Sequence, residues 1–221
     1  MTHRLATSRL AALSALAALT AWPAASALAM EPEVADALSG LQSRWAEIRY
    51  DLPENQQEDA YAALAERAEQ AVAAHPDAAE LHAWAGIVRS TQAGASGGLS
   101  ALSLVKQARE ELEASLSLDP LALDGAAYTS LGALYYQVPG WPVSFGDDEK
   151  AERYLKRGLG VSPDGLDSLY FWGDYLHEQG RDQEARQALR HALEAAPRPG
   201  RERADAGRRQ EVQALLEQLD H

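Results

Sequence analysis

The 221-residue chain contains no cysteine, only two methionines and only two phenylalanines. Without cysteine the protein forms no disulfide, performs no thiol chemistry and carries no lipid on a cysteine side chain. Beyond the first 29 residues, the chain has no uncharged apolar run of the roughly 20 residues that a membrane-spanning helix needs. These absences exclude a disulfide-stabilised fold, a thiol enzyme and a protein with several membrane spans.

Positive charge is also scarce, because 20 Lys and Arg stand against 33 Asp and Glu, for a net charge of −13. Such an acidic chain is repelled by phosphates and by anionic membranes, so no nucleic-acid partner is expected. The six histidines form no short metal-binding motif, and no metal or cofactor is expected. Asp174, His177 and Glu178 share one helical turn, but a solvated helix face explains them better than a metal site.

The first 29 residues have the order of features that is typical of a secretory signal peptide. Arg4 and Arg9 precede or flank an apolar run at 10–19, and the segment 27–29 has the small-x-small cleavage pattern Ala-Leu-Ala. The alternative is an N-terminal anchor, although the apolar run is short for a bilayer. We therefore expect residues 1–29 to be a signal peptide, and residues 30–221 to be a periplasmic domain with no stable membrane insertion after cleavage.

Large and small apolar residues recur at helical spacing over residues 169–197. Spacings of three, four and seven residues place side chains on one face of a helix. The pattern comprises Leu169, Trp172, Gly173 and Leu176 in a first helix, Ala185, Leu189 and Ala192 in a second helix, and then Pro197. Related patterns precede two earlier prolines: Tyr128, Leu131, Gly132, Tyr135, Ala151, Leu155 and Gly158 before Pro163, and Leu81, Trp84, Ala85, Val88, Ala108, Leu112 and Ser115 before Pro120.

At these positions the chain resembles the tetratricopeptide repeat family, whose unit is a helix hairpin of about 34 residues. The resemblance implies an all-α fold in which each hairpin buries its apolar face against the next. We predict a tetratricopeptide-like α-solenoid of about four helix hairpins plus a C-terminal capping helix. The predicted repeats span approximately residues 33–77, 78–122, 125–165 and 166–199, and the capping helix spans 205–220.

The two earlier proline-to-proline intervals exceed the family period by nine and ten residues. We place the excess in two loops between paired helices, Thr91–Ser100 and Val138–Asp148. The first contains the G-x-S-x-G pattern of a hydrolase nucleophile elbow, which leaves a serine hydrolase acting through Ser96 as an unfavoured alternative. That chemistry requires a strand before the serine, and no sheet is expected here.

Two segments each allow a structural and a functional interpretation. In the second loop, Trp141 and Phe145 either fill the gap between repeats or wall a binding site, because large aromatics seldom stay unpacked in water. The segment Arg198–Arg209 contains five arginines. These either pair with the acidic body of the domain or clamp an anion or carboxylate, which guanidinium groups suit.

The family resemblance also implies a binding face, the concave groove lined by first-helix residues beside the packing positions. Polar groups mixed with tyrosine suit peptide or protein recognition. We therefore predict a non-catalytic, exported scaffold that binds a peptide or partner protein, and not an enzyme. The implied contact residues are His82, Arg89, Thr129, Tyr136, Gln137, Asp167, Tyr170, Asp174 and His177, with Trp141 at the rim.

A finer resemblance rests on four short segments. They are Tyr128-Thr129-Ser130-Leu131-Gly132, Pro139-Gly140-Trp141-Pro142, Phe145-Gly146-Asp147-Asp148 and Pro197-Arg198-Pro199-Gly200-Arg201. They resemble a family of uncharacterised exported bacterial tetratricopeptide proteins, and are loosely similar to tetratricopeptide partners of TRAP-type solute transporters. Those partners are lipoproteins with a ligand pore, whereas this chain lacks the cysteine for lipidation. A TRAP-associated component that binds a solute or partner is therefore an alternative function.

Overall fold

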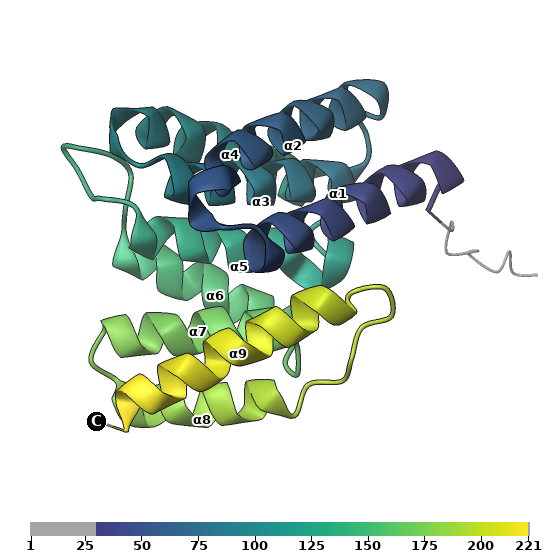
Figure 1. Ribbon diagram of the computed structural model, residues 1–221. Coiled ribbons are helices and arrows are strands. Elements are labelled where there is room, and N and C mark those ends of the chain that lie inside the picture. Colours follow the sequence, from purple (N-terminus) through teal and green to yellow (C-terminus); the bar gives the residue numbers. More distant parts are fainter. Residues whose placement is uncertain (1–29, 221) are drawn as a thin grey trace, which may run out of the picture.

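The computed structural model describes residues 30–220, so the predicted signal peptide lies outside the described residues. Within that range the chain forms helices and no strand (Figure 1). No described helix is both long and apolar enough to cross a membrane. The helices are α1 (Pro32–Asp51), α2 (Glu54–Ala74), α3 (Ala79–Ser96), α4 (Gly98–Leu118), α5 (Ala122–Gln137), α6 (Asp148–Val161), α7 (Leu166–Glu178), α8 (Asp182–Leu193) and α9 (Glu202–Leu219).

The first eight helices pair in order as four hairpins, α1–α2, α3–α4, α5–α6 and α7–α8, and α9 follows them. The first helices of successive hairpins, α1, α3, α5 and α7, contact one another in sequence. Each second helix contacts the first helix of the next hairpin, which is the stacking that buries the apolar faces. The predicted all-α solenoid of four hairpins and a C-terminal helix is confirmed.

Three of the hairpins close on the same contact, a glycine on the first helix against a leucine on the second. A Cβ on Gly86 would lie 2.6 Å from Cγ of Leu112, and a Cβ on Gly132 would lie 2.6 Å from Cγ of Leu155. In the last hairpin, a Cβ on Gly173 would lie 2.7 Å from the leucine at position 189. Only glycine allows the two backbones to come this close.

The predicted register of the α3 repeat was wrong by one residue. Leu81, Ala85 and Val88 are buried as predicted, but Gly86 and not Ala85 occupies the close contact. Both alignments put apolar residues on one helical face, so hydrophobic spacing alone did not separate them. The shift turns His82 and Arg89 away from the concave side and toward neighbouring helices.

The predicted loop at Thr91–Ser100 was also wrong, because α3 continues to Ser96 and α4 begins at Gly98. Gly97 and Gly98 have φ angles of +64° and +63°, which allow the chain to reverse almost at once. The extra length of this repeat lies in its helices, of 18 and 21 residues, against 13 and 12 in α7 and α8. The predicted loop after Gln137 is present and ends at Asp147, whose carboxylate accepts the Lys150 N–H at 2.9 Å and caps α6.

Helix α9 closes the row of first helices into a ring, since it contacts both α7 and α1 (Figure 1). Gly207 makes the approach possible, because a Cβ there would lie 2.4 Å from the Tyr50 ring. An ion pair joins Arg49 of α1 to Glu211 of α9 at 2.7 Å. The sequence predicted α9 as a cap on the last hairpin, but gave no indication that it would reach the first.

We predict that Gly132→Ala lowers the free energy of unfolding by roughly 1–3 kcal/mol, because its Cβ overpacks the contact with Leu155. Gly160→Ala is the matched control on α6, where an added Cβ has no neighbour within 4 Å. That change should stabilise the helix by about 0.5–1 kcal/mol. Urea denaturation followed by circular dichroism measures both, and equal stability of the two variants would contradict the packing described here.

Candidate functional site: the cavity inside the helix ring

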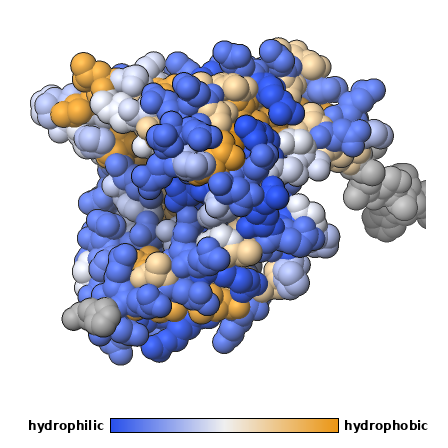
Figure 2. All heavy atoms as spheres, viewed as in Figure 1, coloured by the Kyte–Doolittle hydropathy of each residue, from blue (hydrophilic) through white to orange (hydrophobic). Residues whose placement is uncertain are grey.

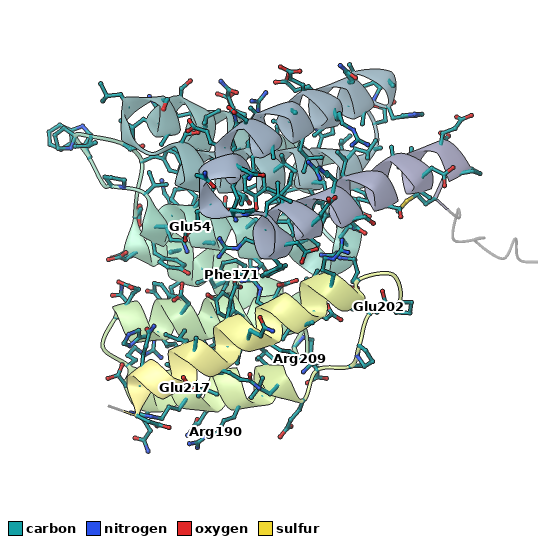
Figure 3. All side chains as sticks on the ribbon, viewed as in Figure 1. Glu54, Phe171, Arg190, Glu202, Arg209 and Glu217 are labelled. Carbon is teal, nitrogen blue, oxygen red and sulfur yellow. The ribbon has the colours of Figure 1, made fainter. Side chains whose placement is uncertain are left out.

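The ring of α1, α3, α5, α7 and α9 surrounds a cavity of about 1270 Å³, to which α2, α4 and the segments between helices also contribute. Its volume exceeds the roughly 300–1,000 Å³ of most small-molecule pockets. Exposed residues at its edge, among them Glu54, Gln137 and Pro139, show that the cavity opens to solvent. Figure 3 labels two residues of the cavity wall, Glu54 at the start of α2 and Phe171 on α7.

Aromatic side chains form much of the wall. Trp45 and Trp84 pack edge to face with ring centroids 5.9 Å apart, and Trp45 Nε1 donates a hydrogen bond to Thr91 Oγ1 at 3.0 Å. Burial raises the pKa of the Tyr50 hydroxyl to about 12, so that this group stays neutral and can donate. The hydroxyl of Tyr61 is buried and has no hydrogen-bond partner among the described residues.

Charged side chains form a second part of the wall, centred on Asp167 of α7. The two carboxylate oxygens accept hydrogen bonds from Arg208 at 2.8 Å and from Arg198 at 2.7 Å. Burial would raise the pKa of Asp167, but the charges of Arg208 and Arg198 outweigh it and hold the pKa well below its usual value. Arg198 also binds Asp205 at 2.5 Å, and Arg208 also binds Glu211 at 2.5 Å.

Arg201 differs from the other arginines of the wall, because it has no ion pair in the described part of the chain. Its Nε is buried without a hydrogen-bond partner, and its guanidinium carbon lies 5.0 Å from the centroid of the Trp84 ring. Burial and the nearby positive charge of Arg198 lower the pKa of Arg201. Two of the five arginines of the segment 198–209 thus pair with wall acids, and Arg201 remains unpaired.

The remaining two arginines of that segment are held outside the cavity wall. Arg203 pairs with Asp51 at 3.1 Å, and Arg209 donates to the carbonyl oxygens of Leu193 and Ala195 at 2.5 and 2.6 Å. The interpretation of the segment as pairing with the acidic body therefore describes three of its five arginines, Arg198, Arg203 and Arg208, while Arg209 binds backbone carbonyl oxygens.

Four of the residues predicted to line the groove are in the cavity wall: Thr129, Gln137, Asp167 and Tyr170. Two others join adjacent helices, since the Tyr136 hydroxyl donates to Asp174 at 2.5 Å between α5 and α7. His177 instead lies 2.9 Å from an oxygen of Asp182 at the start of α8.

The other predicted contact residues of α3 lie away from the wall. His82 Nδ1 is 2.7 Å from Glu111 Oε2 on α4, and Arg89 forms an ion pair with Glu69 on α2. Both contacts follow from the register of this repeat, because His82 and Arg89 lie one helical turn before and after Gly86, on the side of α3 that faces the paired and preceding helices. In their place, Trp84 and Ile87 of α3 line the cavity.

The two aromatic residues of the loop after α5 have different environments. Phe145 packs against Tyr135 with centroids 5.4 Å apart and lies under the Arg109 guanidinium, whereas Trp141 is 89% exposed. Val138 and Pro139 at the start of this loop line the cavity, so the loop lies at its rim. Figure 2 shows hydrophobic side chains at the edge of the molecule where this loop and the start of α4 lie.

The sequence did not predict that residues of α1 and Trp84 of α3 line the cavity. Trp84 and Ile87 flank Gly86 at the same offsets as Ser130 and Ala133 flank Gly132, and all four line the cavity. Alignment of the repeats on their glycines would have found them. No repeat signal predicts the contributions of Trp45, Tyr50 and Arg201, which depend on the contact of α9 with α1.

The backbone of the wall contains an unusual turn at the start of α5. Leu123 and Asp124 have φ angles of +51° and +55°, followed by Gly125 at +73°. Positive φ is uncommon outside glycine, and such residues persist only where the surrounding structure holds them. Leu123 and Asp124 both line the cavity, so this strained turn is part of its wall.

Ser96, the candidate nucleophile, is the last residue of α3 and follows a helix in place of the strand that a nucleophile elbow requires. Among residues 30–220, no group of three or more His, Asp or Glu side chains is placed to hold a metal ion.

Comparison with known protein families finds a match over the last hairpin. Residues 166–199 match the tetratricopeptide repeat. The match covers α7, α8 and the turn that follows, and it supports the tetratricopeptide family for this solenoid. No curated protein matches the chain. Tetratricopeptide proteins are generally non-catalytic scaffolds that commonly bind proteins or peptides, which suggests an interaction scaffold here.

We predict that Asp167→Asn lowers the free energy of unfolding at neutral pH by roughly 2 kcal/mol or more, because it leaves two guanidinium groups without their shared carboxylate. The folded-state pKa of Asp167 lies below its unfolded value, near 3.8, so its stabilisation is present above that pH and is lost as the pH falls toward the folded-state pKa. The stability difference from wild type should therefore shrink below about pH 4.

Denaturant unfolding at a series of pH values measures this difference. Asp164→Asn is the control, because its side chain is 80% exposed and pairs only with a half-exposed histidine. A difference that stayed constant with pH for Asp167→Asn would contradict a charged Asp167 in the folded state.

Proposed function

We propose that this chain is an exported, non-catalytic scaffold that binds an extended segment of a partner protein in the ring cavity, with the Trp141 loop at the rim. The observation that carries the proposal is the cavity of about 1270 Å³ on the concave side of a tetratricopeptide solenoid. Concave faces of solenoids are extended binding surfaces, because successive repeats present equivalent side chains along them.

The chemistry of the wall supports a peptide ligand. Tyr170 and Phe171 offer aromatic area that is already held in place, since the Arg208 guanidinium lies 4.3 and 4.8 Å from their ring centroids. Thr129 and Gln137 on the neighbouring helix α5 also line the cavity and carry hydrogen-bonding groups. Rigid aromatic anchors beside polar groups are typical of peptide-binding interfaces.

A second candidate is a solute-binding component associated with a TRAP-type transporter. It is favoured by the closure of the ring, which surrounds the cavity with helices as a site for a small solute requires. Binding of a small molecule in the cavity without capture of any protein segment would favour this candidate over the scaffold.

Export makes a prediction about the first residue of the processed protein. Cleavage after the Ala-Leu-Ala pattern at 27–29 should leave a chain that begins at Met30. N-terminal sequencing of the protein from the periplasmic fraction checks this. Recovery of a chain with Met1 intact from the cytosol would refute export.

Partner binding predicts that Tyr170→Ala weakens capture by about tenfold or more, because buried aromatic anchors dominate such interfaces. The partner is first identified with a photo-crosslinking residue at Gln137, which is exposed at the cavity edge. Its binding to each variant is then measured by calorimetry.

Two controls accompany this measurement. The crosslinker at Arg190, exposed on α8, should give no product with the same partner. Tyr154→Ala removes a partly buried tyrosine that stacks on Tyr135, outside the cavity wall, and should leave affinity unchanged. Equal affinity of the Tyr170 and Tyr154 variants, both with wild-type helicity, would place the binding site elsewhere.

A further inference from the structure

We propose that Arg201, held on the face of Trp84, binds a carboxylate group of the ligand inside the ring cavity. The inference rests on the proposed function only in taking the cavity as the ligand site. The carboxylate has two possible sources, the C-terminus of a bound peptide or a small organic acid, and the experiment below separates them.

The charges of the wall leave one cation without a partner. Arg49 and Arg208 share Glu211, while Arg198 and Arg208 share Asp167, and Arg198 also binds Asp205. These ion pairs join three arginines to three acids. Arg201 lies close enough to this cluster to interact with the charges of Asp167 and Asp205, but it forms no ion pair of its own, so an anion that entered the cavity there would give it a direct partner.

The placement of Arg201 favours a planar anion. A guanidinium over an aromatic face is held in orientation by the ring, while its N–H groups point outward in its own plane. That edge matches the two oxygens of a carboxylate, which accept a pair of parallel hydrogen bonds. The buried Nε of Arg201 has no hydrogen-bond partner among the described residues, so no acceptor within the fold uses this donor.

The surroundings of Arg201 indicate what else the ligand carries. Trp45 packs against Trp84, and Ile87 and Leu123 belong to the same apolar cluster and line the cavity. A carboxylate attached to an apolar or aromatic group fits this combination, because the apolar part can pack where the anion pairs.

A purely structural role does not account for Arg201. It precedes α9 but its side chain caps no helix end, and it makes no ion pair within residues 30–220. A partly buried guanidinium that makes no ion pair adds little stability, so stability alone favours a neutral residue of similar length at this position. Arg201→Met retains the stem that covers Trp84 and removes only the charge and its donors.

The experiment measures binding by calorimetry and by the fluorescence of the wall tryptophans, with the protein lacking residues 1–29. The small-acid probe is 4-phenylbutyrate, compared with its neutral amide. The peptide probe is acetyl-Phe-Ala-Leu with a free C-terminus, compared with the same peptide amidated. Each is titrated into wild type, Arg201→Met and the exposed control Arg190→Met.

We expect at least one acid probe to bind wild type and Arg190→Met with the same affinity. Its affinity for Arg201→Met should be lower by about tenfold or more. The corresponding amide should bind the wild-type protein more weakly than the acid by a similar factor. Thermal unfolding should show that Arg201→Met is at least as stable as wild type. Stronger binding of the peptide acid assigns the carboxylate to a C-terminus, and stronger binding of phenylbutyrate assigns it to a small organic acid.

Amides that bind as tightly as acids, an unchanged affinity of Arg201→Met, or no binding of either acid at millimolar concentration would each overturn the inference. The proposed function is judged separately by the crosslinked partner. Capture of that partner with equal affinity by wild type and Arg201→Met would retain the scaffold and reject the carboxylate site. Acid binding that depends on Arg201, without any captured partner, would retain the carboxylate site and reject the scaffold.

Discussion

The shape of this protein depends on the ion cluster around Asp167. Asp167 belongs to α7, its partners Arg198 and Arg208 belong to the segment before α9 and to α9, and Glu211 continues the cluster to Arg49 of α1. One connected set of charges therefore fixes three of the five helices of the ring. The cavity exists because α9 crosses from α7 to α1, and these contacts hold it there.

The same cluster gives the cavity its electrostatic character. Internal pairs are stabilising only when each charge has a partner, since an unpaired charge in a poorly hydrated wall is costly. Asp167, Asp205 and Glu211 neutralise three guanidinium groups, and the fourth is left over the Trp84 ring. The wall therefore combines a set of arginines and acids that pair with one another and a single guanidinium, that of Arg201, that can pair with a ligand.

The sequence predicted the features that depend on residues close together along the chain, namely the helix hairpins and their close contacts. Helical spacing and proline positions gave the hairpins, and Gly132 and Gly173 were placed correctly at close helix contacts. The register around Gly86 was misplaced because two alignments bury equally apolar faces. Closure of the ring was not predicted, because it depends on the contact of Gly207 in α9 with Tyr50 in α1, and no periodic pattern encodes a contact between these two helices.

Contact between α1 and α9 also changes how such a protein can lose or gain structure. An open solenoid is nearly one-dimensional, so that its terminal repeats fray independently and its length can vary by whole units. Here the terminal helices support each other, which couples the two ends into one cooperative unit. An added or deleted hairpin would separate the surfaces that meet at Tyr50 and Gly207, so the number of repeats is fixed by geometry.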